Sequence, residues 1–188
     1  VEVSSSGGVP IIASQRINLK SMPTYSSYAE FMGLPGAVLT ETRYLFPWYN
    51  NATAGGLSSQ LRFGNVGNAQ TTVTIKIGGV TQPTTYTLAP NQSQRVTFDI
   101  DNGPVEIFSS GGVPIIASQR INLKSMPTFS SYAEFMGLPG AVLTETRYLF
   151  PWYNNAPAGG LTSQLRFGNV GNAQTTVTIK IGGVTQPT

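Results

Sequence analysis

The clearest indication of the fold class is the stretch TTVTIKIGG, residues Thr71–Gly79. Its apolar side chains, Val73, Ile75 and Ile77, alternate with threonine and lysine. A period of two is typical of a β-strand with one face on a core, because successive side chains point to opposite sides. We therefore predict a half-buried strand here, followed by a loop that leads to a further strand carrying Tyr86.

Neighbouring stretches show the same alternation and predict more strands. Arg95–Asp101 alternates apolar and polar residues, and Asn102-Gly103 is expected to turn the chain back into a strand over Val105–Ser109. The stretches Ser59–Gly67 and Val113–Leu123 indicate two further strands. Many short strands separated by Gly, Pro and Asn turns favour an all-β sandwich or barrel.

One helical turn is expected within this β pattern. Ser27 is followed three residues later by Glu30, which is the spacing of a capping box. Gly33 can end the turn, and Pro35 prevents its continuation. We expect this turn to bridge two sheets.

The sequence also repeats itself on the scale of a domain. Val1–Thr84 aligns with Val105–Thr188 without a gap, at an offset of 104 residues, and five of the 84 pairs differ, so that 79 are identical. The differing pairs are Val3/Ile107, Ser4/Phe108, Tyr25/Phe129, Thr53/Pro157 and Ser58/Thr162. An engineered duplication would give identical copies, so a natural tandem duplication is favoured. The unit is as long as a whole domain and longer than a solenoid repeat.

The predicted hairpin crosses the point where the first copy becomes the second, so the unit is not expected to begin at residue 1. We place a complete β-sandwich repeat at 57–160, the second part of one repeat at 1–56 and the first part of the next at 161–188. The stretch NNATAGG is the candidate linker. A window from a longer array is favoured over a two-repeat protein. The partial repeats would then need strands donated by a neighbouring molecule.

The composition limits the classes of function. The chain has 188 residues, and 10% of them are charged, against about 25% in a typical soluble protein. A surface with so few charged side chains suits a protein that carries glycan or packs into an assembly. The net charge of +3 arises from scattered residues without a basic run, so nucleic acid is not an expected partner. No apolar run of about 18 residues predicts a membrane span.

The residue types argue against catalysis. The chain has neither His nor Cys, which removes the commonest general base and the commonest transition-metal ligands. A pair of carboxylates could still serve a glycosidase. The acids of one unit are Glu2, Glu30, Glu41, Asp99 and Asp101. We expect no enzyme, no cofactor and no metal site. A glycosidase is the least favoured of three hypotheses for the function.

The aromatic stretch RYLFPWYNN is a candidate contact surface. Tyr44, Phe46 and Trp48 alternate and are predicted to form one buried face, which leaves Tyr49 as the exposed ring. A sugar-binding platform is the alternative. The residues that could form it are Trp48 and Tyr49 in the first copy and Trp152 and Tyr153 in the second.

Two sequons are candidate glycosylation sites. Asn51-Ala52-Thr53 and Asn91-Gln92-Ser93 both match the N-glycosylation pattern, and both lie in predicted turns. In the second copy Pro157 replaces the threonine, so Asn155 is not an acceptor. A covalent glycan is therefore possible at Asn51 and Asn91.

The layout resembles the immunoglobulin-like β-sandwich repeats of microbial surface-layer, adhesin and fibre proteins. The stretches LRFGNVGNAQTTVTIKIGG (Leu61–Gly79) and TYTLAPNQSQRVTF (Thr85–Phe98) carry this resemblance. It implies extracellular structural work at the cell surface and carries over no catalytic residue. We expect beads on a string that self-associate into a filament, fibre or layer. The alternative is an adhesin stalk or a multivalent carbohydrate-binding protein, in which repetition supplies avidity.

Overall fold

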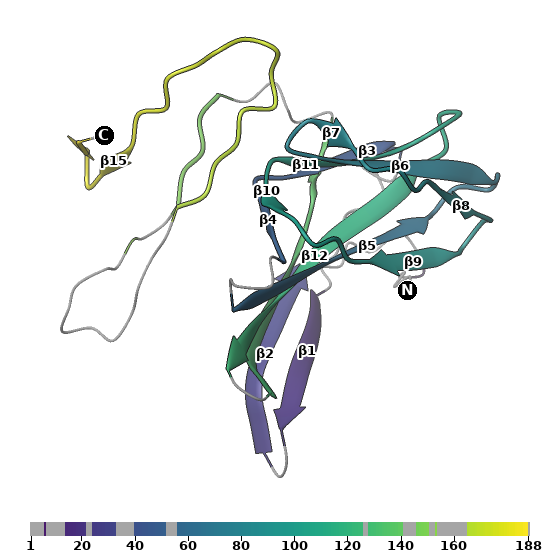
Figure 1. Ribbon diagram of the computed structural model, residues 1–188, viewed down its shortest axis with the longest axis horizontal. Helices are drawn as coiled ribbons and strands as arrows, with labels where there is room; N and C mark the ends of the chain where they lie inside the picture. The colour runs from purple at the N-terminus through teal and green to yellow at the C-terminus, as the bar shows by residue number, and fades with distance from the viewer. Residues whose placement is uncertain are drawn as a thin grey trace.

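The protein is all-β, with antiparallel strands (Figure 1). The structure is a computed structural model, and it describes residues 6, 14–21, 24–32, 40–51, 56–125, 128–140, 146–150, 153 and 165–187. Among these residues no α-helix forms. The predicted fold class is therefore confirmed at the level of antiparallel β-sheets, while tandem immunoglobulin-like repeats stay a prediction.

The larger sheet combines residues from both copies of the repeat. Its strands are β14 (Leu138–Pro139), β3 (Arg43–Phe46), β11 (Val105–Ser109), β6 (Thr71–Ile77), β7 (Val80–Thr81) and β8 (Tyr86–Leu88). They run in the order β14-β3-β11-β6-β7, and β8 also pairs with β6. Gly78 and Gly79 join β6 to β7 with φ of 60° and 80°. Left-handed angles at both turn positions suit a two-residue hairpin loop, and glycine adopts them without steric cost.

The smaller sheet has the order β13-β12-β5-β9. Its strands are β13 (Thr128–Met136), β12 (Ile115–Ser125), β5 (Leu57–Asn65) and β9 (Ser93–Val96). Three two-stranded pairs complete the described structure. They are β1 (Ser14–Ser21) with β2 (Thr24–Met32), β4 (Tyr49–Asn50) with β10 (Asp101–Asn102), and β15 (Lys180–Ile181) with β16 (Val184–Thr185).

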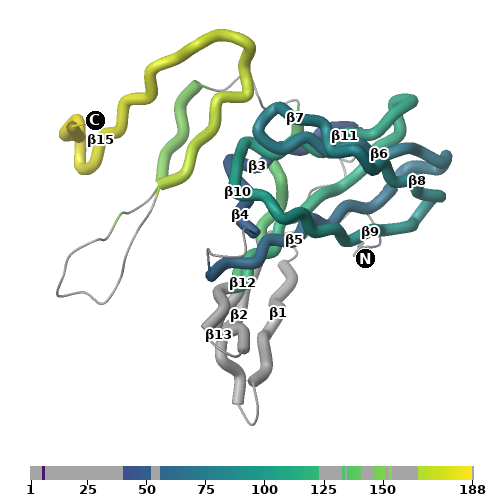
Figure 2. Tube along the Cα trace, viewed as in Figure 1, coloured from purple at the N-terminus to yellow at the C-terminus, as the bar shows by residue number. Residues whose placement is uncertain are grey.

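The hydrophobic core lies between these two sheets. In Figure 2, β6, β8 and β11 of the larger sheet lie above β5 and β9 of the smaller one. The predicted alternation in Thr71–Ile77 is confirmed, because its buried and half-buried residues alternate along the whole strand. The core residues are Tyr44, Phe46, Tyr49, Leu61, Phe63, Val73, Ile75, Ile77, Leu88, Val96, Val105, Ile107, Ile115 and Ala117. Inward side chains from both sheets thus exclude water from one shared interior.

The predicted hairpin at Asn102-Gly103 is wrong. The chain before it, β9, pairs with β5 in the smaller sheet, whereas β11 after it pairs with β3 and β6 in the larger sheet. The intervening β10 pairs with β4 instead. Val96 and Val105 are therefore buried on opposite walls of the core, and the chain crosses from one sheet to the other between them.

The predicted helical turn at Ser27–Glu30 is also wrong, because both residues lie within β2. Pairing with β1 places Ser27 opposite Leu19 and Glu30 opposite Arg16. Hydrogen bonds to a neighbouring strand satisfy the backbone along its length, so a local capping signal does not decide the conformation. The corresponding stretch of the second copy forms β13 in the same way, paired with β12.

The strand pairing spans the predicted junction between repeats. β3 precedes the candidate linker at 50–56, and β4 ends at its first residue, Asn50. These strands pair with β11 and β10, which follow the linker. Most of that linker lies outside the described residues. The residue at which one repeat ends and the next begins stays a prediction.

Candidate functional site

Tyr49 belongs to the aromatic stretch and is completely buried. Its hydroxyl donates a hydrogen bond to the Ser59 carbonyl oxygen at 2.9 Å and accepts one from the Phe98 N–H at 2.8 Å. Burial raises the pKa of Tyr49 to about 12, although the Phe98 hydrogen bond acts in the opposite direction. The expectation of an exposed Tyr49 is therefore wrong. Both polar partners of its hydroxyl come from the interior, so the ring faces inward.

The rest of the aromatic stretch follows the prediction in part. Tyr44 and Phe46 are buried in β3, as expected. Burial, with a smaller contribution from Glu41, raises the pKa of Tyr44 to about 12. Trp48 is only half-buried, because β3 ends at Phe46 and the next residue is Pro47. Proline has no N–H to donate to a neighbouring strand, so the strand alternation stops before the tryptophan.

Trp48 is contacted by the second copy of the repeat. The Arg166 guanidinium lies over the indole ring, 3.7 Å from its centroid, which is a cation–π contact. Tyr153 is 37% exposed, and Trp152 lies outside the described residues. Because Tyr49 is buried, it cannot contribute to an exposed aromatic platform.

The two sequon asparagines differ in their surroundings. Asn51 is half-buried, and its side-chain nitrogen donates a hydrogen bond to the Phe98 carbonyl oxygen at 2.9 Å. That nitrogen is the atom to which an N-glycan would be attached. Asn91 is exposed in the turn between β8 and β9, with a φ of 63°. Of the two, Asn91 has the geometry of an acceptor, and Asn155 lies outside the described residues.

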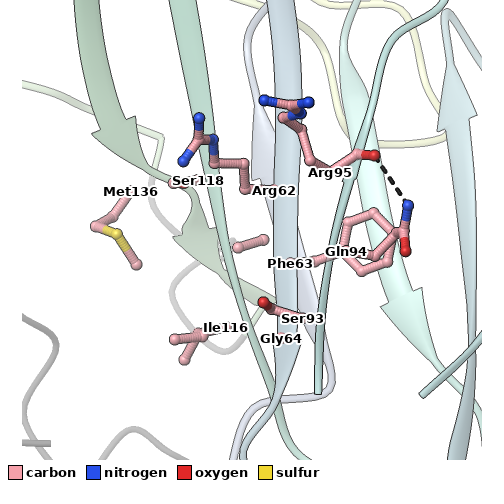
Figure 3. A pocket seen from close by; sticks show the side chains of 10 residues that line it. Arg62, Phe63, Gly64, Ser93, Gln94, Arg95, Ile116, Ser118 and Met136 are labelled. Atoms are coloured by element: carbon pink, nitrogen blue, oxygen red, sulfur yellow. Dashed lines mark hydrogen bonds between the residues drawn. The ribbon is translucent and has the colours of Figure 1, made fainter. Parts of the chain in front are cut away.

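A groove of about 590 Å³ crosses the outer face of the smaller sheet (Figure 3). Arg62 on β5 and Arg95 on β9 are register partners, so two guanidinium groups line the groove side by side. At Gly64, an added Cβ would lie 3.5 Å from the Ser93 Cβ. The glycine therefore leaves this part of the groove floor without a side chain. The alternation of LRF predicts an outward Arg62, but its pairing with Arg95 depends on tertiary structure. Such a groove suits an anionic or hydroxyl-rich ligand.

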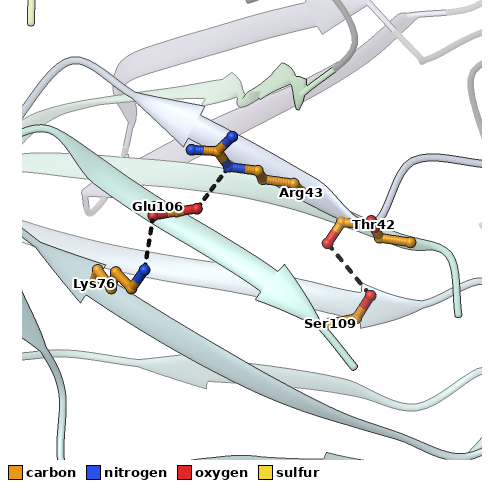
Figure 4. Close-up of polar contacts among 5 residues, drawn as sticks. All are labelled: Thr42, Arg43, Lys76, Glu106 and Ser109. Carbon is orange, nitrogen blue, oxygen red and sulfur yellow. Dashed lines mark hydrogen bonds and ion pairs between the residues drawn. The ribbon is translucent and has the colours of Figure 1, made fainter. Parts of the chain in front are cut away.

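A charged cluster lies on the larger sheet (Figure 4). Glu106 on β11 forms ion pairs with Arg43 on β3, at 2.6 Å, and with Lys76 on β6, at 3.6 Å. Lys76 also lies 5.0 Å from the centroid of the Phe108 ring. These contacts join three neighbouring strands. Opposite charges across strands stabilise a sheet modestly.

The described residues provide little for metal or acid chemistry. Among them, no three His, Cys, Asp or Glu side chains gather as a metal site would require. The residues that line the groove include no carboxylate. Within the described part of the chain, no helix is long and apolar enough to cross a membrane.

The most informative feature is a sequence that occurs twice in different surroundings. Thr42–Asn51 and Thr146–Asn155 have identical sequences. In the first copy Tyr44, Leu45 and Phe46 are 0%, 4% and 1% exposed. Their counterparts Tyr148, Leu149 and Phe150 are 54%, 80% and 68% exposed. Three large apolar side chains are thus buried in one copy and exposed in the other.

Comparison with known proteins gives one distant structural match. No family model matches the sequence, and no curated protein matches it. The crystal structure of Thermotoga maritima 1070 is similar, with a TM-score of 0.40 and 15% sequence identity. The match covers 52% of this chain and 93% of that one.

Proposed function

We propose that this chain belongs to an extracellular structural protein. Its repeats of 104 residues build a cell-surface filament, fibre or layer by self-association, without catalysing a reaction. Each repeat is an immunoglobulin-like β-sandwich, and the nearly identical copies present one kind of contact at regular spacing. Regular spacing of one contact is what a fibre or lattice requires.

The observation that carries this proposal is the exposure of Tyr148–Phe150. The same three residue types are buried in β3, where they lie between β14 and β11. A run of large apolar side chains that lies outside a sheet is stabilised when contact with another copy of the chain removes it from water. Self-association buries these side chains without a second kind of protein.

The surface composition supports an extracellular location. Only 10% of the residues are charged, so little electrostatic repulsion opposes association. A hydrophilic glycan on exposed Asn91 would keep such a surface soluble and would limit contacts to the intended ones. A surface with few charges and a covalent glycan both suit a cell-surface protein.

Electron microscopy of native cell-surface material tests the proposal. Labelling with an antibody against this chain should decorate filaments or a layer with a regular spacing. Purified native material that stays as dispersed monomers, with no periodic labelled structure on cells, would overturn the proposal. The mass of the native protein on a denaturing gel gives the number of repeats.

A second candidate function is carbohydrate binding by a multivalent adhesin, and the groove is the observation that favours it. Arg62 and Arg95 line the groove together with Ser93 and Gln94, so it offers several hydrogen-bond donors to an acidic or hydroxyl-rich glycan. Binding to a glycan array that Arg95→Ala abolishes would support this function. The absence of binding for both proteins would remove it.

A further inference from the structure

Side chains on the outer face of the smaller sheet form a charged row that crosses three strands. Arg95 on β9 pairs with Arg62 on β5, and Arg62 pairs in turn with Ser118 on β12. Residues directly opposite each other on antiparallel strands point to the same face of the sheet. The register therefore places two guanidinium groups and a hydroxyl group side by side. We call Arg95, Arg62 and Ser118 the charged row.

A second row lies two residues away along the same strands, a separation of about 7 Å. It consists of Ser93, Gly64 and Ile116, which are also register partners. Gly64, in the middle, has no side chain, so we call these residues the low row. Both rows line the groove, which is the space above the low row and beside the charged row (Figure 3).

The charged row by itself is unfavourable for the fold. Like charges directly opposite each other on neighbouring strands destabilise a sheet. The residues that line the groove include no carboxylate, so this pair of arginines is not neutralised from within the groove. Arg95 is exposed and therefore accessible to a ligand. An anion held between Arg62 and Arg95 would offset their repulsion, whereas a neutral ligand would not.

We infer that the groove binds an acidic polysaccharide, with a carboxylate or sulfate group between Arg62 and Arg95 and the attached sugar ring over Gly64. Guanidinium groups present paired N–H donors that match the oxygens of such an anion. At the two ends of the low row, Ile116 offers the ring an apolar contact and Ser93 offers a hydroxyl group. The inference rests on the second proposed function, carbohydrate binding, and names the class of glycan.

Calorimetric titration of the 188-residue chain tests the class of ligand. The probes are a cello-oligosaccharide, its 6-sulfate and its 6-carboxylate, which share length and linkage and differ in charge. An acidic probe should bind with a Kd at least about tenfold lower than that of the neutral probe, because only the acidic one forms charged hydrogen bonds with the arginines. Comparison of the two acidic probes shows which oxyanion is preferred. Equal binding of the neutral probe would overturn the inference.

The repeat provides a matched control for the arginines. Arg62→Gln and Arg95→Gln should each raise the Kd of the acidic probe about tenfold or more. Arg166 is the counterpart of Arg62 in the second copy, but it lies over Trp48 and does not line the groove. Arg166→Gln removes the same charge and should leave the Kd unchanged. Equal losses for Arg62→Gln and Arg166→Gln would show attraction by net charge alone and would contradict the inference.

The melting temperature gives a readout that a purely structural role of Arg95 would move in the opposite direction. Arg95→Gln removes the repulsion between like charges, so the ligand-free variant should melt at the same temperature as the wild type or slightly above it. The acidic probe should raise the melting temperature of the wild type and not that of the variant. A lower melting temperature with unchanged binding would show that Arg95 stabilises the fold and does not contact the ligand.

A substitution in the low row separates a sugar in the groove from an anion on the arginines alone. At Gly64 an added Cβ would lie 3.5 Å from the Ser93 Cβ and 3.9 Å from the Ile116 Cγ1, so a side chain fits the strand in ordinary contact. Gly64→Val fills the low row and keeps both charges. Binding of the acidic probe should fall at least about tenfold, whereas inorganic sulfate should bind both proteins equally. Undiminished binding of the probe would place the sugar elsewhere and overturn the inference.

The outcomes separate this inference from the proposed functions. Equal binding of acidic and neutral probes leaves carbohydrate binding in place and removes the preference for an acid. Binding of none of the three probes overturns this inference, whereas carbohydrate binding itself is decided by the glycan array. The proposed filament or layer depends on neither result, because the periodicity of cell-surface material tests it.

Discussion

Arg43–Phe46 and Arg147–Phe150 have the same sequence, RYLF, and different surroundings. The first is β3, hydrogen-bonded to β14 and β11, with the Phe46 ring in edge-to-face contact with Phe135. The second lies in no strand of the described structure, and its three large side chains are exposed. The same apolar pattern is thus a core strand in one copy and lies outside the described strands in the other.

The largest expected effect is a difference between Phe46→Ala and Phe150→Ala. Phe46→Ala should lower the free energy of unfolding by about 3–5 kcal/mol, because it leaves a cavity in the core. Phe150→Ala should change it by less than about 0.5 kcal/mol, as is usual for an exposed position. Urea unfolding of the monomeric chain measures both. Equal losses would show that the second segment is also buried.

A smaller effect separates the two buried tyrosines. Tyr49→Phe should lower the free energy of unfolding by about 1–3 kcal/mol, because the buried Ser59 carbonyl and the Phe98 N–H lose their partner. Tyr44→Phe should be neutral or stabilising, since the Tyr44 hydroxyl has no hydrogen-bond partner among the described residues. Denaturant unfolding of the two variants compares them, and a larger loss for Tyr44→Phe would contradict the assignment.

Alkaline pH should destabilise the fold through the same tyrosines. Their pKa values rise from 10 in the unfolded chain to about 12 in the folded one. Below pH 10 both states keep the protons, so the stabilisation is complete. Between pH 10 and 12 only the unfolded state loses them, and the free energy of unfolding falls by about 1.4 kcal/mol per pH unit for each tyrosine.

Thermal unfolding between pH 9 and 12 measures this slope. The wild type should lose stability more steeply than Tyr44→Phe, since the variant has one fewer proton to keep. Identical slopes for the two proteins would show that Tyr44 ionises as readily in the folded state as in the unfolded one.

The smallest expected effect concerns the charged cluster. Arg43→Ala should cost about 0.2–1 kcal/mol, because the Arg43–Glu106 ion pair is partly exposed to solvent. Arg147→Ala, at the corresponding position of the second copy, should have no measurable effect. High salt should reduce the difference, because it screens exposed charges. A difference that persists in high salt would indicate that Arg43 acts through packing instead.

Much of the fold was predictable because strand periodicity is a local property. The alternation in TTVTIKIGG predicts Val73, Ile75 and Ile77 on one buried face, and all three are in the core. The turn at Asn102-Gly103 was misassigned because a local turn signal does not reveal which sheet the next strand joins. The capping-box signal at Ser27 failed because pairing with β1 determined the conformation there.

The candidate site was predicted less well. The sequons were visible from their pattern, but the hydrogen bond of the Asn51 side chain, which distinguishes it from Asn91, is made to Phe98, 47 residues away. The alternation predicts an exposed Tyr49, because Tyr49 falls out of phase with Tyr44 and Phe46. It is buried because it belongs to β4, a separate strand that pairs with β10.

The repeat of 104 residues, most of the β-strands and their apolar faces can be read from the sequence alone. These properties follow from side-chain spacing and local chain stiffness. Which of two identical segments is buried depends on the tertiary structure, as Phe46 and Phe150 show. The physical reason is that a strand is stabilised by its neighbours on both sides, and identical letters carry no information about which neighbours are present.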